Sequence, residues 1–575
     1  MAVTIGNERQ RIAPGRSLAT VVDFATRSHA RAVLVLLVVA ALNFLPGFFT
    51  IPPVDRDEAR FAQATKQMVE TGDYIDIHFQ DEVRYKKPVG IYWLQAGIVK
   101  AASALGMSQA LTTIWLYRIP SLAGAIGSVL LTYWAALAFV PRRAAVLAGL
   151  MMASCILLGV EARLAKTDAM LLVTIVAAMG ALARVYLPER RSRLDEMDRW
   201  TLPGIFWTAL AAGVLIKGPL IALFIGLPIV LLMIIDRSAR WFLLLRPLPG
   251  LIWFALLVVP WFVAILSRAG SETFFAESVG RDMLPKIFNS QESHGAPPGY
   301  YLTLFWVTFW PGATLAVLAA PAVWAARREP GAKFLLAWVV PAWIAFEIVI
   351  TKLPHYVLPL YPAIAILIAG IIDARMLSRR PRLETGTIWW FVFPTLVGIA
   401  GIVCAIVIGQ QLGLLAWPLI GAAAVFGLLA WRLYEPDGPE LSLLRGALSS
   451  LLIAAAAFGV IIPSLGKIFP SAALANILRD SGCPQPLAAS AGYHEASLVF
   501  LTGTSTRLTD AAGAAEFLRG DECRFAFIEA RQERNFAQRA DAIGLRYSSG
   551  PRVEGINIGN GQSITIGVYR SGGPR

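Results

Sequence analysis

The sequence has few charged residues, few histidines and few cysteines. Only 15% of its 575 residues are charged, whereas 56% are hydrophobic and the mean hydropathy is +0.60. Globular chains carry about a quarter of charged residues, so this composition excludes a soluble multidomain protein. The five histidines and four cysteines include no H-x-x-H or C-x-x-C spacing. We therefore expect no cofactor, and the ligand spacing does not support a divalent metal.

The net charge of +13 suggests a nucleic-acid partner, but the basic residues follow a different pattern. Most of them form short clusters between apolar runs, which is typical of the cytoplasmic loops of membrane proteins. The sequence contains no basic stripe with interleaved aromatic residues. We therefore expect that the chain binds no nucleic acid.

Long apolar runs predict a protein that crosses the bilayer many times. A bilayer core of about 30 Å needs a helix of about 20 apolar residues. The run Ala32–Phe49 follows an arginine-rich segment and precedes no small-residue cleavage pattern. It predicts a retained anchor with a cytoplasmic N-terminus. Further candidate spans are 114–139, 144–160, 168–187, 203–216, 219–235, 249–267, 299–324, 334–350, 357–373, 388–409, 413–431 and 446–463.

Residues 90–105 decide on which side of the membrane the later loops lie. They are apolar, but they form a short run that carries Gln95 and Lys100. If they span the bilayer, the later basic clusters face outward; if they lie along its surface, those clusters face the cytoplasm. Because basic loops of membrane proteins face the cytoplasm, we predict that residues 90–105 form an amphipathic interfacial helix. The chain then has about thirteen spans and an external C-terminus. The segments placed on the external face are Val54–Pro88, Glu161–Asp168, Lys217–Pro219, Arg268–Pro298 and Lys352–His355.

The chain changes character at residue 464, where the long apolar runs end. Residues 1–463 predict a transmembrane domain with a first external loop over 51–113, and residues 464–575 predict a small external α/β domain. Within the latter, Arg524–Glu529 and Ile556–Tyr569 have strand patterns, and Gly559-Asn560-Gly561 predicts a hairpin turn.

Two further segments of this domain, Ala511–Arg519 and Glu533–Ile543, have helical patterns. Cys483 and Cys523 also lie in it, on the oxidising side of the membrane. A disulfide and two separate thiols are both compatible with the sequence, because it gives no distance between them.

The first external loop places three carboxylates beside two arginines, in Asp55-Arg56-Asp57-Glu58-Ala59-Arg60. Two prolines precede this segment, a pattern typical of a helix start. One interpretation is structural: Asp55 or Asp57 caps the helix and Glu58 favours its dipole. The other is catalytic, with Asp57 and Glu58 as a general base or as sugar-binding carboxylates and Arg60 as a substrate contact. These residues alone leave both open.

A basic cluster follows in Arg84-Tyr85-Lys86-Lys87-Pro88. It could be a solvated patch against lipid headgroups, or a site in which Tyr85, Lys86 and Lys87 bind a lipid phosphate. Pro88 favours an extended backbone at the preceding residue. With an interfacial helix beginning near Gly90, that geometry would hold a cation at phosphate depth.

Glu161-Ala162-Arg163-Leu164-Ala165-Lys166-Thr167-Asp168 interrupts an apolar hairpin with four charges. Each charge costs about 2.5–3.5 kcal/mol inside a bilayer, so the residues are either snorkelling turn residues or functional ones. Asp168 heads the next apolar helix, which favours a catalytic role for it and a binding role for Arg163. A single histidine without partners is usually structural. Further binding candidates on the same predicted face are Lys217, Arg281, Lys352, His355 and Tyr356.

Five of these motifs, in this order, resemble the superfamily of aminoarabinose transferases and protein O-mannosyltransferase-like enzymes. The similarity is greatest to the aminoarabinose (4-amino-4-deoxy-L-arabinose) transferases and covers residues 32–373. The motifs are Asp57-Glu58-Ala59-Arg60-Phe61-Ala62, Tyr85-Lys86-Lys87-Pro88 with Tyr92-Trp93-Leu94, Ala162-Arg163 through Asp168, Lys217-Gly218-Pro219, and Lys352-Leu353-Pro354-His355-Tyr356-Val357-Leu358-Pro359.

The resemblance implies an all-α polytopic GT-C fold in the bacterial inner membrane, with interfacial helices in the first periplasmic loop. It also implies a sugar donor carried on a polyprenyl phosphate. Asp57 and Asp168 match the family's two acidic positions. Lys87 and Tyr356 match residues around the lipid phosphate, and Arg281 matches an arginine there.

The chain departs from the family at two positions that bear on the substrate. Lys86 stands where aminoarabinose transferases carry glutamate, and Ser278 interrupts their Glu-Glu-His run. These departures weaken the case for a metal site of that kind. The added cation leads to the hypothesis of a donor sugar with a carboxylate, such as a uronic acid.

The sequence thus predicts a glycosyltransferase that moves a sugar from polyprenyl phosphate to a periplasmic acceptor, such as lipid A or another envelope glycan. A protein O-mannosyltransferase-like enzyme is the alternative within the same superfamily. A flippase or transporter of polyprenyl-linked lipids is disfavoured, because transporters place charges near the midplane of repeated halves. Here the charged motifs gather on one face.

Overall fold

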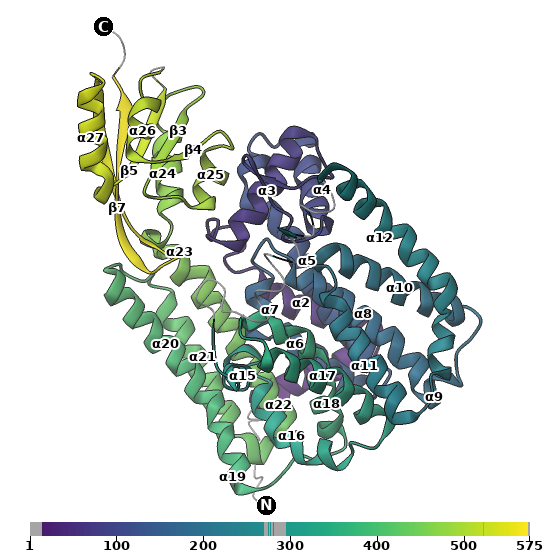
Figure 1. Ribbon diagram of the computed structural model, residues 1–575. Coiled ribbons are helices and arrows are strands. Elements are labelled where there is room, and N and C mark those ends of the chain that lie inside the picture. The colour runs from purple at the N-terminus through teal and green to yellow at the C-terminus, as the bar shows by residue number, and fades with distance from the viewer. Residues whose placement is uncertain are drawn as a thin grey trace, which may run out of the picture.

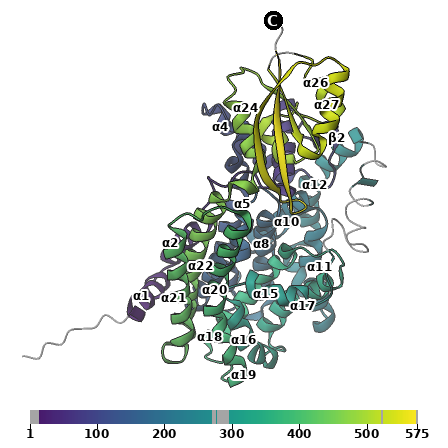
Figure 2. The same cartoon turned by 90° about the vertical axis from the view of Figure 1, so that its left-hand side faces the viewer.

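A bundle of long helices forms one part of the molecule, and a small sheet domain stands at one end of it (Figures 1 and 2). The computed structural model describes residues 14–269, 274, 276–277, 280, 295–520 and 523–572. Helix α1 (Pro14–Thr26) lies toward the end of the bundle opposite the sheet domain (Figure 2). The described start and end of the chain are therefore at opposite ends of the molecule.

Among the described residues, eight helical stretches are long and apolar enough to cross a membrane. They are α5 (Ile114–Ala136), α8 (Asp168–Tyr186), α10 (Asp198–Lys217), α12 (Pro247–Ala269), α17 (Pro330–Ile348), η4 with α18 (Pro354–Asp373), α19 through α20 (Pro381–Ile408) and α22 through α23 (Tyr434–Ser464). Shorter apolar helices are α2 (His29–Phe44), α11 (Leu220–Asp236), α16 (Ala313–Ala325) and α21 (Ala416–Arg432). The chain is thus a multi-pass helical protein, while the count of thirteen spans stays a prediction.

The predicted span 144–160 is two helices, α6 (Arg142–Ala153) and α7 (Ile156–Glu161). The break leaves backbone carbonyls without helical partners, and such groups must be satisfied inside a bundle. The Asn43 side chain of α2 donates a hydrogen bond to the carbonyl oxygen of Ala153, at 2.9 Å. A polar side chain from a neighbouring helix therefore stabilises the interruption.

The predicted span 299–324 is also interrupted, between α15 (Tyr300–Thr308) and α16. Pro311 lies in the gap, and it cannot donate a backbone hydrogen bond. The indole nitrogen of Trp390 donates to the carbonyl oxygen of Pro311, at 3.0 Å. The run is apolar throughout, so its hydropathy alone did not reveal the interruption.

The first external loop folds into two helices and a short hairpin. Helix α3 (Asp57–Thr71) packs against α4 (Gly90–Ala104), and strands β1 (His78–Phe79) and β2 (Glu82–Val83) lie between them in the chain. Both helices lie at the end of the bundle that faces the sheet domain (Figure 1). The helix predicted over 90–105 is confirmed, and its placement along the membrane surface stays a prediction.

The C-terminal domain is a five-stranded sheet in the order β4-β3-β5-β7-β6, with helices packed against it. The β3, β4 and β5 strands are parallel, and β7 pairs antiparallel with β5 and β6. The strands are β3 (Leu487–Ala491), β4 (Arg507–Thr509), β5 (Arg524–Glu529), β6 (Tyr547–Asn557) and β7 (Gln562–Ser571). The helices are α24 (Pro470–Arg479), α25 (Ala496–Thr502), α26 (Ala511–Phe517) and α27 (Glu533–Ala542).

Several predictions for this domain are confirmed. The β5 strand has the predicted bounds, α26 and α27 lie where helices were expected, and the β6–β7 turn falls at residues 558–561. Cys483 and Cys523 form a disulfide with a Cα–Cα distance of 5.7 Å, which decides between the two alternatives that the sequence left open. The bridge joins the segment before β3 to the start of β5.

Candidate functional site

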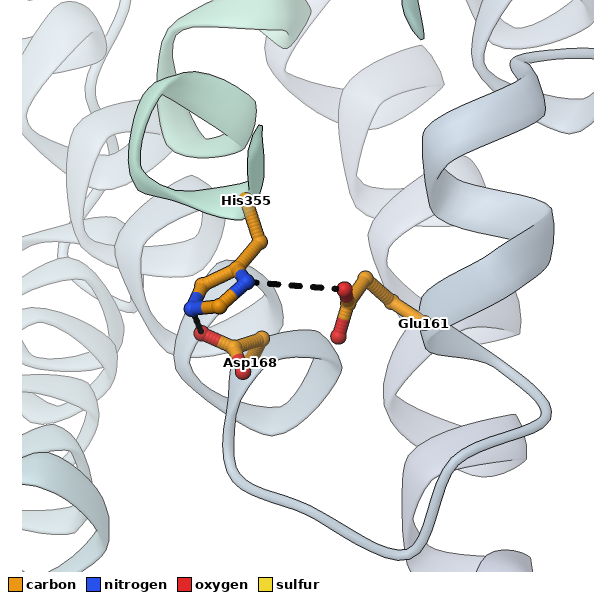
Figure 3. A group of neighbouring side chains, drawn as sticks. All are labelled: Glu161, Asp168 and His355. Carbon is orange, nitrogen blue, oxygen red and sulfur yellow. Dashed lines mark ion pairs between the residues drawn. The ribbon is translucent and has the colours of Figure 1, made fainter. Parts of the chain in front are cut away.

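A cluster of buried charged side chains lies where three helix ends meet. The Lys166 ammonium nitrogen is 3.0 Å from Glu161 Oε1 and 3.4 Å from Asp168 Oδ2. The ammonium group of Lys217 is in direct contact with Asp168 Oδ1. The His355 ring lies between the two carboxylates, with Nδ1 3.9 Å from Glu161 and Nε2 3.6 Å from Asp168 (Figure 3).

Three separate stretches of the chain supply these residues. Glu161 is the last residue of α7, Asp168 is the first of α8, and Lys166 lies in the loop between them. Lys217 ends α10, and His355 lies in η4 (Pro354–Leu360). A carboxylate at a helix N-terminus is stabilised by the helix dipole, as is a cation at a C-terminus. The positions of Asp168 and Lys217 therefore suit their charges.

Lys166 is ion-paired with both carboxylates of this cluster. Burial by itself lowers the pKa of its ammonium group, but the carboxylates of Glu161 and Asp168 outweigh burial and raise that pKa above the ordinary value. The Lys166 side chain also lies 3.4 Å from His355 Nδ1. The two carboxylates therefore favour the charged form of Lys166.

Glu161, Asp168 and His355 together offer the donor types that a metal ion would need. Their ligand atoms all lie within 4.8 Å of one another. Lys166 and Lys217 lie in the same cluster, however, and already place two positive charges against its two carboxylates. The residues present therefore form a charge-balanced group without a further cation. Glu161 Oε2 is buried and accepts no hydrogen bond from the described residues, which leaves it available to a polar ligand group.

The basic motif of the first loop lies against this cluster. A Cβ on Gly90 would stand 2.7 Å from the carbonyl oxygen of Leu215, so the start of α4 touches the end of α10. A Cβ on Gly218 would be 3.8 Å from the Pro88 ring. Lys87, which precedes Pro88, is near enough for its charge to act on His355.

The two candidate carboxylates at the start of α3 have different surroundings. Asp57 is exposed, and its charge acts on Lys166. Glu58 is buried and forms a two-pronged ion pair with Arg118 of α5, at 2.8 and 2.9 Å. Glu58 also accepts backbone hydrogen bonds from Val54 and from Ala165. These contacts favour a catalytic role for Asp57. They favour a structural role for Glu58, which joins the first loop to the helix bundle.

Arg163 and Lys352 donate hydrogen bonds to backbone carbonyl oxygens. The guanidinium group of Arg163 donates to the carbonyl oxygens of Asn43, Pro46 and Gly159. The Lys352 ammonium group donates to three carbonyl oxygens at the C-terminal end of α17, at 2.6 to 3.1 Å. Their predicted part in substrate binding stays a prediction, and these contacts favour a structural one.

The remaining candidates are spread around the site. Tyr356 follows His355, and its ring lies 5.9 Å from the Lys217 ammonium group. Tyr85 is buried against Phe274, whereas Lys86 is exposed and Arg60 is half-buried. Arg281 lies outside the described residues.

Sequence reasoning left three residues of this region without an assigned part: Glu161, Lys166 and Arg118. Glu161 and Lys166 stood inside a motif already singled out, and their two charges in an apolar hairpin were the available signal. Arg118 is the only charged residue within its predicted span, 114–139. An intramembrane charge of that kind predicts a buried partner, although not which one.

The chain is similar to several known proteins. The profile of the family described as dolichyl-phosphate-mannose-protein mannosyltransferase matches residues 34–271. An undecaprenyl phosphate-α-4-amino-4-deoxy-L-arabinose arabinosyl transferase of Erwinia tasmaniensis is 30% identical over 322 residues, 54% of either chain. The protein of the same name from Edwardsiella ictaluri is 26% identical over 497 residues, 84% of this chain and 82% of that one. The first of these alignments spans about half of the relative's length.

A solved structure extends the likeness to nearly the whole chain. ArnT from Cupriavidus metallidurans in the apo state superposes with a TM-score of 0.72 at 18% identity, covering 95% of this chain and 100% of that one. The chain has the fold of ArnT. The structure of ArnT bound to undecaprenyl phosphate superposes with a TM-score of 0.71 at 18% identity, covering 94% of this chain and 97% of that one. At this identity the superposition establishes the fold alone.

One titratable group joins the first loop to the sheet domain. Asp55 Oδ1 accepts a hydrogen bond from the backbone nitrogen of Ser497, at 3.0 Å. Burial and the nearby Glu495 together raise the pKa of Asp55 to about 6, although Ser497 and Arg60 act to lower it. The Tyr493 hydroxyl faces the same group.

This raised pKa predicts a stability that falls as pH rises. The folded state keeps the Asp55 proton up to about pH 6, whereas an unfolded chain releases it near pH 4. Deprotonation therefore costs stability between these values, by an amount on the order of 3 kcal/mol. We expect thermal unfolding in detergent to show a stability loss from pH 4.5 to 7 that Asp55→Asn lacks. Parallel pH profiles for the two proteins would contradict this.

Proposed function

We propose that this protein is a membrane glycosyltransferase that moves a sugar from a polyprenyl phosphate to an envelope acceptor. The names of its relatives and the undecaprenyl phosphate in the ArnT structure support this class of reaction. In our proposal the N-terminus is cytoplasmic, and the cluster, the first loop and the sheet domain lie on the periplasmic side. The acceptor is lipid A or another envelope glycan.

The observation that carries the proposal is the position of the lysines. Lys166 and Lys217 contact the two buried carboxylates, and the Lys87 loop packs against the same helix end. Lipid phosphate is an anion that stays near the membrane surface, where cations on helix ends can meet it. The buried carboxylates keep Lys166 and Lys217 in place. In our proposal Lys87 is the cation that binds the lipid phosphate.

The reaction breaks the bond between the sugar's anomeric carbon and the phosphate oxygen. The electron pair remains on the departing polyprenyl phosphate, whose negative charge Lys87 stabilises by a preorganised contact. An acceptor oxygen forms the new bond to the anomeric carbon. If the acceptor is a hydroxyl, its proton passes to the exposed carboxylate of Asp57. If it is a phosphate, already ionised at neutral pH, no base is needed and Asp57 orients the acceptor.

Asp168 and Tyr356 complete the proposed donor site. Asp168 is held by two ammonium groups and lies beside His355, so its carboxylate has a fixed orientation toward the sugar. The Lys217 ammonium group lies 5.9 Å from the centroid of the Tyr356 ring, and in our proposal Tyr356 contacts the lipid phosphate. The exposed Lys86 suits a donor sugar that carries a carboxylate, and equal transfer of neutral and acidic sugars would remove that part of the proposal.

The proposal is tested by the envelope of a strain that lacks this protein. Mass spectrometry compares lipid A, other lipids and envelope glycans from the deletion strain, the strain with wild type restored, and the strain with Asp57→Asn. We expect one glycan to lose a single sugar, and wild type but not Asp57→Asn to restore it. A sugar missing from proteins instead would favour the protein O-mannosyltransferase-like alternative. A lipid-linked intermediate trapped on one side of the membrane would favour a flippase.

A further inference from the structure

The turn before α3 has a backbone conformation that must be held from outside. Arg56 has φ 71° and ψ −113°, in the left-handed half of the map where residues other than glycine are rare. It stands at the N-cap position of α3, and no side-chain hydrogen bond caps the helix there. Asp57 is the first residue of the helix. The direction of Asp57 thus depends on what keeps this turn in place.

The two residues of the turn are both held by the sheet domain. Asp55 Oδ1 accepts from the Ser497 backbone nitrogen at the start of α25, at 3.0 Å. The Arg56 guanidinium group donates to the carbonyl oxygen of Gly559, in the β6–β7 turn. Two elements of the domain, far apart in its sequence, therefore grip adjacent residues of the first loop.

A buried chain of hydrogen bonds holds Ser497, the residue of α25 that contacts Asp55. The Ser497 hydroxyl donates to Ser471 Oγ at 2.6 Å, and Ser471 is 2.8 Å from the Tyr493 hydroxyl. All three side chains are buried. A satisfied buried network of this kind is rigid, so the nitrogen that Asp55 meets is held in place.

The domain also holds α3 further along its length. The Lys66 ammonium group is buried and donates to the Phe500 carbonyl oxygen at 3.0 Å. Gln63 donates to Thr504 Oγ1 at 2.9 Å. Helices α3 and α25 accordingly lie side by side (Figure 1). Polar, well-aligned contacts fix register as well as proximity.

The residue after Asp57 is anchored in the opposite direction. Glu58 is paired with Arg118 of the bundle and accepts from the Ala165 nitrogen, in the loop that carries Lys166. Asp57 therefore stands between one anchor on the sheet domain and one on the bundle. We infer that the C-terminal domain positions Asp57 toward the charged cluster, with Asp55 and Arg56 as positioning residues. This inference rests on the proposed function.

A matched pair of variants tests it in the full-length protein. Asp55→Asn keeps an oxygen that accepts from Ser497, whereas Asp55→Ala removes it. A small misplacement of a catalytic group costs up to about 100-fold in rate. We expect Asp55→Ala to lower the envelope product by about 10- to 100-fold, with Asp55→Asn near wild type. Glu516→Ala, on the exposed face of α26, is the control and should match wild type.

Two further measurements separate positioning from loss of fold or of the whole reaction. Hydrogen exchange should be faster across residues 57–62 in Asp55→Ala than in wild type, whatever the reaction is. Binding of undecaprenyl phosphate to the purified protein should stay unchanged, because the Lys87 loop is held by other contacts. Equal losses in Asp55→Ala and Asp55→Asn, or wild-type product from a loosened turn, would overturn the inference. Wild type that makes no product would overturn the proposed function alone, since the exchange result would stand.

Discussion

Lys87→Ala is expected to fold and insert as wild type does and to lose about 100- to 1,000-fold of its transfer rate. Lys87 is half-buried, in a loop that packs against the end of α10, and it faces His355. Removing one preorganised donor from a developing negative charge typically costs about 2.7–4 kcal/mol of barrier. The rate is measured as envelope product per amount of protein in the complemented deletion strain.

Lys100→Ala is the matched control for that substitution. Lys100 is an exposed lysine of α4, and its ammonium group lies over the ring of Tyr74, 5.2 Å from the centroid. It changes the net charge of the same surface by the same amount and should leave the rate unchanged. A Lys87→Ala protein with near-wild-type turnover would remove Lys87 from the phosphate site. Equal losses in the two variants would mean that surface charge, not the specific contact, supports the reaction.

Glu58→Ala is expected to destabilise the protein by about 3–5 kcal/mol, the usual cost of removing one partner of a buried ion pair. The substitution leaves the Arg118 guanidinium group buried with only the carbonyl oxygens of Phe48, Ile51 and Pro52. It also removes the acceptor for the Ala165 nitrogen. Thermal unfolding in detergent, followed by size-exclusion profile, measures the loss.

The control for the stability measurement is Glu82→Ala, which removes an exposed carboxylate from the same loop. It should unfold at the wild-type temperature. If Glu58→Ala also unfolded there while losing all activity, Glu58 would be catalytic, as the sequence first suggested. A Glu58→Ala protein with both stability and activity intact would mean that Glu58 has neither a structural nor a catalytic role.

The apolar runs of the sequence were enough to predict most of the helices. The run at 168–187 is α8 (Asp168–Tyr186), and the run at 219–235 is α11 (Leu220–Asp236). The reason is that a long apolar segment in lipid must satisfy its own backbone, which a helix does within the segment. The β6–β7 turn was also predictable from local sequence, because glycine permits the backbone conformation that the turn needs.

The order of the motifs was also in the sequence, and it predicted the superfamily. The break inside 144–160 was not predictable in this way, since it depends on Asn43 of another helix. Hydropathy describes each segment by itself and carries no information on such partners.

What the tertiary structure alone decided is which charges meet. Glu161 and His355 come from distant segments, and Glu161 Oε1 lies 3.9 Å from His355 Nδ1. The same packing sends Arg163 into a cage of carbonyl oxygens, although it stands in the same motif as Asp168. The sequence determined the residue types and the helix ends that carry them. Pairing required the helix packing, because the energy of a charge depends on the distance to its partner and on burial, which many segments fix together.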